Sequence, residues 1–168
     1  MQNPEKVQIA AQAVRTALPQ GFSPRVGIVL GTGLGALANA VTSPVAIPYE
    51  SLPGFPRSTV ASHAGSFLCG FLGGAPVVLQ QGRCHLYEGY QPEDVCMGVR
   101  VMAALGAATL VITNAAGALN PQFDAGDLMC ITDHINFTGR TPLAGPNHDA
   151  WGPRFPDMSA PYAPGLVQ

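Results

Sequence analysis

The chain has 168 residues, of which 47% are hydrophobic and 11% are charged, and its formal net charge is −2. This length suffices for one domain with a sizeable core, and the composition is that of a globular protein, not of a disordered chain. The charge balance provides no basic field for nucleic acid or an anionic membrane, so any anion must be held by local geometry. A charged fraction less than half the usual ~25% predicts that apolar surface is buried between subunits.

The N-terminal region is predicted to contain a helix, then a strand, then a glycine-rich turn. Apolar residues at helical spacing predict a helix over residues 4–18, and a β-branched apolar run predicts a buried strand over 25–30. Residues 36–41 are compatible with a second helix. Residues 44–56 are rich in proline and are expected to form a surface loop.

The turn Gly31-Thr32-Gly33-Leu34-Gly35 lies between that strand and the helix-compatible segment. Backbone N–H groups and the positive end of a helix dipole would make such a turn an anion cradle, to which Thr32 adds a hydroxyl. The pattern matches neither the P-loop nor the dinucleotide fingerprint, which disfavours dinucleotide binding. A tight turn that needs glycine only for its backbone angles is the alternative.

The rest of the chain alternates further strands with one clear helix. We predict strands at 67–72, 76–81 and 127–133, a further buried strand at 109–113, and a helix at 92–105. Gly73-Gly74 indicates a hairpin between the first two strands. A strand, helix, strand order predicts parallel pairing, with ligands bound outside the carboxyl ends of the strands. Residues 140–168 lack periodicity and are expected to form a long loop, either a lid, an interface arm or a segment missing its partner.

The polar residues of 80–90 carry the strongest chemical signal. If the preceding strand continues to His85, Arg83 and His85 share one face and together predict an oxyanion site. Glu88 would then orient them or accept a hydrogen bond from a substrate hydroxyl. The alternative is a surface ion pair between Arg83 and Glu88, with His85 merely packing. Cys84 would face the opposite side, which disfavours a catalytic cysteine.

Two further segments leave room for a ligand. His63 lies among small residues; a lone histidine is more often an ordinary loop residue than a catalyst. The small-residue turn Asn114-Ala115-Ala116-Gly117-Ala118 lets a ligand approach the backbone closely. With the turn at Thr32 and the residues around Arg83, three loops are expected to converge on one edge of the sheet.

Cysteine and histidine spacing indicates neither a disulfide framework nor a metal site. The four cysteines lack C-x-x-C spacing, and three lie in apolar segments expected to be buried, which favours free thiols in a reducing cytosol. The four histidines lack short ligand spacing. We also predict neither a signal peptide nor a membrane span.

Eight short motifs in order resemble the trimeric type of purine nucleoside phosphorylase. They occupy residues 31–35, 55–59, 63–65, 81–90, 113–117, 133–136, 145–147 and 154–158. Methylthioadenosine phosphorylases share the phosphate loops, but Tyr-Glu-Gly-Tyr and Asn-Ala-Ala-Gly favour the purine nucleoside branch. The implied fold is α/β: a mixed, partly barrel-like twisted sheet flanked by helices. The implied organisation is a single domain over residues 1–168, with 138–168 as a long loop or interface arm.

The resemblance implies attack by orthophosphate on C1′ of a purine nucleoside, releasing the base and ribose 1-phosphate with inversion. Orthophosphate is a co-substrate, and no cofactor or metal is implied. A cytoplasmic homotrimer acting in purine salvage is expected. The implied roles are phosphate binding by Thr32, Gly33, Arg83, His85 and Ala115, catalysis by His85, Glu88 and His63, ribose binding by Tyr87 and a neighbouring subunit's Phe155, and base binding by Ala115, Ala116 and Gly117.

The family continues past the length of this chain with a strand and helix set that supplies the residues recognising the purine. We therefore expect the 168-residue chain to be a truncated form that binds phosphate but turns over inosine or guanosine poorly. The alternatives are a non-catalytic phosphate-binding fragment and a relative of the methylthioadenosine phosphorylases.

Overall fold

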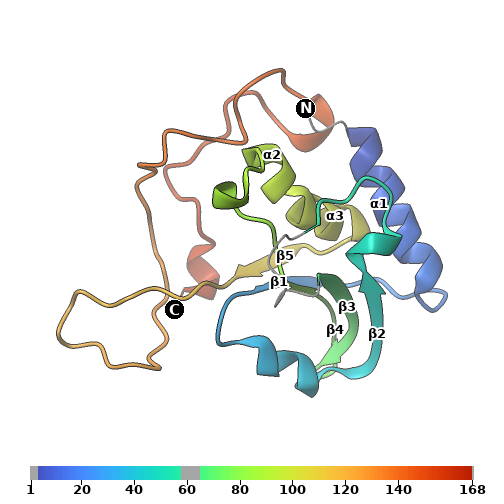
Figure 1. Ribbon diagram of the computed structural model, residues 1–168, viewed down its shortest axis with the longest axis horizontal. Helices are drawn as coiled ribbons and strands as arrows, with labels where there is room; N and C mark the ends of the chain where they lie inside the picture. The colour runs from blue at the N-terminus through green and yellow to red at the C-terminus, as the bar shows by residue number, and fades with distance from the viewer. Residues whose placement is uncertain (1–3, 58–64, 168) are drawn as a thin grey trace. The chain divides into compact units, whose positions relative to one another are not determined.

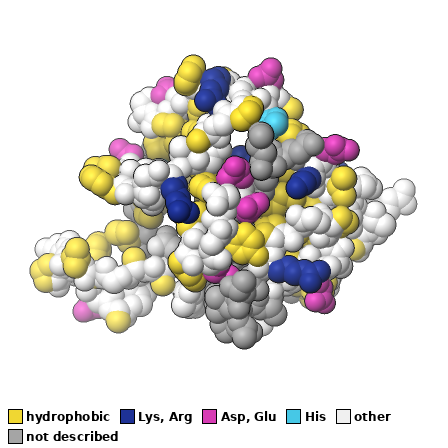
Figure 2. Space-filling view, turned by 45° about the horizontal axis from the view of Figure 1, so that its top comes forward, with side chains coloured by type: hydrophobic (Ala, Val, Ile, Leu, Met, Phe, Trp, Pro, Cys, Tyr) yellow, Lys and Arg dark blue, Asp and Glu magenta, His cyan; other side chains and the backbone are white. Residues whose placement is uncertain are grey.

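The computed structural model describes residues 4–57 and 65–167. The chain divides into two units, Met1–Ala115 and Ala116–Gln168, and each is described by itself. None of the described helices combines the length and the apolar character that crossing a membrane requires. Most of the surface displayed in Figure 2 is uncharged, with acidic and basic side chains occurring singly or in small groups.

The first unit is built on a five-stranded mixed sheet in the order β2-β3-β4-β1-β5. The strands are β1 (Val26–Leu30), β2 (Thr42–Pro48), β3 (Ser66–Leu72), β4 (Ala75–Gln81) and β5 (Thr109–Ile112). β1 pairs in parallel with β4 and β5, whereas β3 pairs antiparallel with β2 and β4. The predicted mixed sheet is therefore confirmed. Over the described residues it remains open, with β2 and β5 at its edges.

Helices cover one face of this sheet. They are α1 (Pro4–Ala17) and α3 (Met97–Leu105), which Figure 1 shows side by side over the strands; the four-residue helix α2 (Pro92–Val95) comes directly before α3. Both predicted helices are confirmed, although the second is divided at Cys96, whose ψ of −4° interrupts the regular turn. The face of α1 that is buried against the sheet and α3 carries residues spaced three and four apart, namely Val7, Ala10, Ala11 and Val14.

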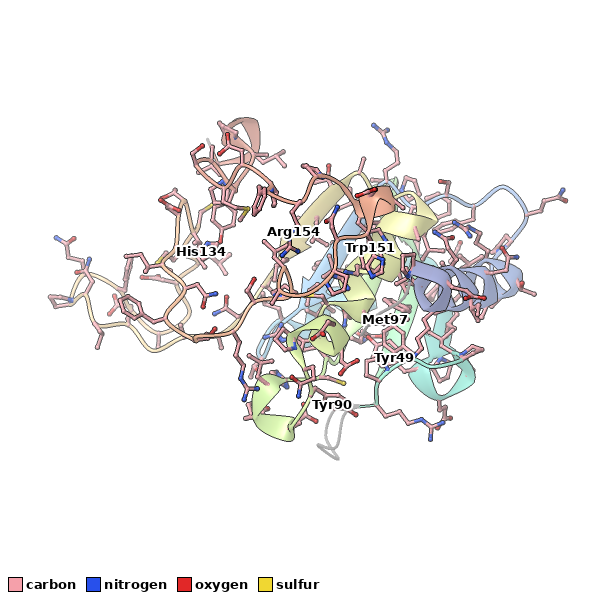
Figure 3. The ribbon with its side chains drawn as sticks, turned by 90° about the horizontal axis from the view of Figure 1, so that it is seen from above. Tyr49, Tyr90, Met97, His134, Trp151 and Arg154 are labelled. Carbon is pink, nitrogen blue, oxygen red and sulfur yellow. The ribbon has the colours of Figure 1, made fainter. Side chains whose placement is uncertain are left out.

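Strand alternation sorts the apolar side chains into a core on each face of the sheet. In β3, Phe67 and Cys69 belong to the helix-side core, whereas Leu68 belongs to the opposite one. The helix-side core also includes Tyr49 and Met97, both labelled in Figure 3. The opposite core is smaller and packs against the short 3₁₀ helix η1 (Gly35–Ala40).

The predicted surface loop over 44–56 is wrong. Much of it forms β2, and Tyr49, Leu52 and Phe55 beyond β2 are buried in the helix-side core. Among the described strands β2 pairs only with β3, so it is an edge strand, and an edge strand tolerates proline because half of its N–H groups need no ladder partner. The prolines therefore indicated an edge position instead of a loop.

Three other sequence expectations are also corrected. Residues 36–41 do not form an α-helix; η1 is a six-residue 3₁₀ helix with no buried residue, so the glycine turn has no long helix dipole behind it. β5 is not a buried strand, because it lies at the sheet edge and Ile112 is 63% exposed. Residues 127–133 do not form a strand.

The second unit has almost no regular structure over residues 116–167. Its only described helical turns are η4 (Asp149–Trp151) and η5 (Pro164–Leu166). None of its described residues is buried, and large apolar side chains such as Leu119, Phe137 and Phe155 are almost fully exposed. It therefore has no hydrophobic core of its own over the described residues.

Candidate functional site

The carboxyl ends of β4, β1 and β5 lie at one edge of the sheet. In the parallel register Leu30 of β1 is opposite Gln81 of β4, and Val29 is opposite Ile112 of β5. The loops that follow these three strands therefore begin at the same level. This confirms the predicted convergence of the Thr32, Arg83 and Ala115 loops on one edge, where ligands bind in sheets of this kind.

The loop after β1 is fixed to the end of β5. The Gly31 N–H donates to Thr113 Oγ1 at 2.7 Å, and that hydroxyl donates to the Val29 carbonyl at 2.8 Å. A Cβ at Gly31 would lie 2.6 Å from the Thr113 carbonyl oxygen, so only glycine fits this approach. Thr32 and Gly33 follow on the exposed side, with Gly33 at a φ of +90°.

Arg83 joins the same edge from β4. Its Nη1 donates to the Thr113 carbonyl oxygen at 2.8 Å, which holds the half-buried guanidinium against the end of β5, two residues before Ala115. A guanidinium has five N–H donors, so one bond to the protein leaves capacity for the oxygens of a phosphate. This is the positive charge that the predicted anion site requires.

His85 is oriented by Glu88. One carboxylate oxygen, Oε1, accepts from the His85 backbone N–H at 2.8 Å and pairs with ring Nδ1 at 2.9 Å. A carboxylate oxygen that accepts from the backbone N–H can also accept from the ring in its Nδ1–H tautomer. The Glu88 side chain is 2% exposed and that of His85 is 24% exposed. A surface ion pair between Arg83 and Glu88 would need an exposed carboxylate, but the Glu88 carboxylate is buried. It instead fixes the His85 imidazole, which is the orienting role predicted for Glu88.

Tyr87 stacks on the His85 ring at 4.7 Å between centroids and 16° between planes. Its side chain is 76% exposed, so one ring face lies against the histidine and the hydroxyl end is accessible. Tyr87 is thus placed beside His85, and its ribose contact stays a prediction.

The local backbone differs from the expected extended strand. β4 ends at Gln81, and Gly82 turns the chain with a φ of +76°, so strand alternation does not place Arg83 and His85. Burial, followed by the nearby Glu88 charge, raises the pKa of the buried Cys84 thiol to about 11. A neutral thiol is a poor nucleophile, which agrees with the prediction that Cys84 is not catalytic.

Tyr49 supports this loop, and sequence reasoning missed it. Its hydroxyl donates to the Gly82 carbonyl at 3.0 Å from within the core, where burial raises the tyrosine pKa above its usual value. The ring also leaves no space at Gly65, where a Cβ would lie 2.1 Å from Cδ2. A buried tyrosine usually finds a hydrogen-bond partner for its hydroxyl, and such a bond can hold a neighbouring loop in place. Tyr49 is 33 residues from Gly82, however, and no periodic pattern in the sequence links the two.

Four predicted site residues are not placed at this edge. His63 lies outside the described residues. Ala116, Gly117 and Phe155 belong to the second unit. There, Arg154, labelled in Figure 3, donates from Nη1 to the Gly145 carbonyl at 2.6 Å and to the Leu143 carbonyl at 3.3 Å, which closes the segment just before Phe155.

Over residues 4–57 and 65–167, no three His, Cys, Asp or Glu side chains form a group suited to a metal ion.

The chain belongs to the Phosphorylase superfamily, whose sequence profile matches residues 25–168. It is 52% identical over 158 residues to purine nucleoside phosphorylase 1 of Bacillus subtilis, covering 94% of this chain and 58% of the relative. It is 51% identical over 142 residues to purine nucleoside phosphorylase of Rattus norvegicus, covering 83% of this chain and 49% of that protein. These relatives confirm the predicted resemblance to purine nucleoside phosphorylases.

Solved structures agree with this assignment. The Schistosoma mansoni purine nucleoside phosphorylase in complex with inosine has a TM-score of 0.89 and 39% identity, covering 98% of this chain and 58% of that one. A Schistosoma enzyme in complex with hypoxanthine has the same TM-score, 0.89. The chain spans only part of its relatives: 58% of the length of the Bacillus subtilis protein, 49% of the Rattus norvegicus protein, and 60% of a third relative, purine nucleoside phosphorylase 1 of Geobacillus stearothermophilus.

Proposed function

We propose that this protein is a purine nucleoside phosphorylase, which catalyses the reversible phosphorolysis of purine ribonucleosides and 2′-deoxyribonucleosides. The observation that carries the proposal is the meeting of Arg83, the Gly31–Gly33 loop and the end of β5 at one sheet edge. A relative with this name matches 94% of the chain at 52% identity, and the similar solved structures hold inosine, hypoxanthine or ribose 1-phosphate.

Orthophosphate is the ligand that suits this edge. Arg83 supplies a planar pair of donors with full charge, and exposed Thr32 and Gly33 supply a hydroxyl and an amide. His85 adds an imidazole held by Glu88. We assign the Ala115 amide to the same anion, because it follows Thr113, whose carbonyl fixes the Arg83 guanidinium. Charge-assisted bonds of this kind hold an anion without a metal ion.

In the proposed reaction a phosphate oxygen forms a bond to C1′ while the glycosidic C–N bond breaks. The electron pair of that bond leaves with the purine, which takes up a proton, and the sugar becomes ribose 1-phosphate with inversion at C1′. The bound phosphate dianion also stabilises the positive charge that develops on the ribose ring. Holding nucleophile and sugar together removes much of the entropic cost of their encounter.

The remaining roles follow the family resemblance. Tyr87 is assigned to the ribose, because it is exposed beside His85. Phe155, which is 86% exposed, is assigned to the ribose of a neighbouring subunit. Ala115 is assigned to the base together with Ala116 and Gly117, and His63 to the rim of the phosphate and ribose sites.

We also propose that the protein is a cytoplasmic homotrimer that acts in purine salvage. The low charged fraction and the exposed apolar side chains of the second unit support assembly, because such surface is usually buried. Light scattering at micromolar concentration should report about three chains, as expected for a closed cyclic trimer. A monodisperse monomer would contradict this assembly for the chain as it stands.

Phosphate titration of the 168-residue chain, followed by calorimetry, tests the proposed site. Arg83→Ala should weaken binding by about 2 kcal/mol, since a charge-assisted contact is lost. Arg25→Ala is the matched control, because Arg25 is exposed at the opposite end of β1. Equal affinity of Arg83→Ala and the unaltered chain would place the anion elsewhere. Release of ribose 1-phosphate from inosine, measured on the same preparations, tests the reaction itself.

A further inference from the structure

Thr113 bonds to both other strand ends of the site. Its N–H donates to the Val29 carbonyl at 3.1 Å, and its Oγ1 donates to the same carbonyl and accepts from the Gly31 N–H. Its own carbonyl oxygen accepts from Arg83 Nη1. One residue at the end of β5 therefore binds the end of β1, the first amide of the glycine turn, and the arginine that follows β4.

The hydroxyl is the part of Thr113 that depends on the side chain. Gly31 is buried, and a buried backbone N–H requires a partner. The Thr113 hydroxyl supplies that partner while it donates its own hydrogen to Val29, and only a hydroxyl side chain of this size can do both. The bond from Arg83, by contrast, is accepted by the backbone carbonyl of residue 113. It therefore depends on the position of that residue and not on its side chain.

We propose that Thr113 is a positioning residue of the phosphate site. Its hydroxyl fixes the start of the turn that carries Thr32 and Gly33, and its carbonyl fixes Arg83, so donors from two strand ends face one anion at a set separation. Thr113 itself does not contact the phosphate. The inference rests on the proposed function and adds to it the residue that aligns the phosphate donors.

Two substitutions isolate the hydroxyl. Thr113→Ser and Thr113→Ala both lack the γ-methyl group, and they differ only in whether the hydroxyl is present. We expect Thr113→Ala to weaken phosphate binding by about tenfold and Thr113→Ser to stay within about twofold of the unaltered chain. Thr109→Ala is the control, since Thr109 lies at the other end of β5. Calorimetric titration gives the affinities, and the urea midpoint shows whether each variant folds.

A spectroscopic measurement separates positioning from general stability. In ¹⁵N NMR without phosphate, Thr113→Ala should shift the signals of the Gly33 amide and the Arg83 Nε, whereas Thr109→Ala should leave both unchanged. A variant that only lowers stability would move the urea midpoint and leave these two signals in place.

The outcomes are distinct. If the unaltered chain binds phosphate and Thr113→Ala binds it equally well, this inference is overturned and the proposed function stands. A serine variant that folds but loses about tenfold in affinity also overturns it, and this result decides the matter even if the alanine variant does not fold. If the unaltered chain does not bind phosphate, the proposed site and the inference fall together.

Discussion

The two units of the chain hold their side chains in different ways. In the first, the site residues are fixed by bonds between segments far apart in sequence, such as Gly31 to Thr113 across 82 residues and Tyr49 to Gly82 across 33. In the second, Arg154 reaches back only 9 and 11 residues to close its turn, and no described residue is buried. The first unit can therefore position charged donors against a packed core, whereas the second positions residues such as Phe155 by local turns.

The largest difference between the units should appear when a phenylalanine is truncated in each. Phe67 is fully buried in the helix-side core, so Phe67→Ala should lower the free energy of unfolding by about 3–5 kcal/mol. Phe137 is 91% exposed in the second unit, and Phe137→Ala should change it by less than about 0.5 kcal/mol. Urea unfolding of both variants makes the comparison. Similar losses would show that Phe137 is covered in solution.

A glycine substitution in each unit should give the next largest difference. Gly31→Ala places a Cβ 2.6 Å from the Thr113 carbonyl, and the resulting overpacking should cost about 1–3 kcal/mol of stability and disrupt phosphate binding. Gly165 has open space around its Cβ position, so Gly165→Ala should be nearly neutral. Thermal unfolding and phosphate titration measure both effects. A Gly31→Ala variant with unchanged stability and affinity would show that the two loops separate at no cost.

Removal of a tyrosine hydroxyl should have a smaller effect. Tyr49→Phe keeps the buried ring but deletes the bond to the Gly82 carbonyl, which should cost about 1 kcal/mol of stability and weaken phosphate binding through the Arg83 loop. Tyr162→Phe deletes the exposed contact with His134 in the second unit and should cost less than half as much. Equal losses in urea unfolding would contradict the stronger support assigned to Tyr49.

The smallest expected difference between the units is in the reactivity of their cysteine thiols. Burial raises the pKa of Cys69 to about 12 and, together with the Glu88 charge, that of Cys84 to about 11, whereas Cys130 is exposed in the second unit. At pH 8 the Cys84 thiolate fraction is about 0.1%, so iodoacetamide should label Cys130 first. Mass spectrometry after short exposure measures this order. Early labelling of Cys84 would contradict its burial.

The raised thiol pKa also has a consequence for stability. The neutral Cys84 thiol is favoured in the folded state, so its contribution is fully present below the pKa of the unfolded thiol, about 8.5. That contribution is lost as the pH rises through about 11. Cys84→Ala should therefore flatten the decline of the urea midpoint between these two pH values, and an identical decline would contradict this.

Local patterns in the sequence were enough for part of this molecule. Periodicity and turn signals predicted α1 and the β3–β4 hairpin, because each depends on nearby residues, and the strand, helix, strand order predicted three loops at one sheet edge. They failed where the answer depended on distant partners. The prolines of β2 are tolerated because β3 is its single neighbour in the part of the chain that the structure describes, and Ile112 is exposed because β5 lies at the edge.

The site showed the same division. Arg83, His85 and Glu88 were identified from a short polar segment, and Glu88 does orient His85. The expected reason for their placement, an extended strand to His85, was wrong because Gly82 turns the chain. Tyr49 and the hydroxyl of Thr113 could not be assigned roles, since their partners at Gly82, Gly31 and Val29 are identified only by the folded register.

The parallel pairing of β1 with both β4 and β5 has a consequence for the order of folding. Its contacts join residues 51 positions apart, as in Val26 to Val77, or 83 apart, as in Val26 to Thr109. Closing such long loops has an entropic cost that local hairpins such as β3–β4 avoid, so parallel pairs form slowly. The sheet edge proposed to bind phosphate depends on both pairs and should be completed late. After dilution from urea, phosphate affinity should then recover more slowly than the helical circular dichroism signal. The rate of that recovery would measure the last step of folding.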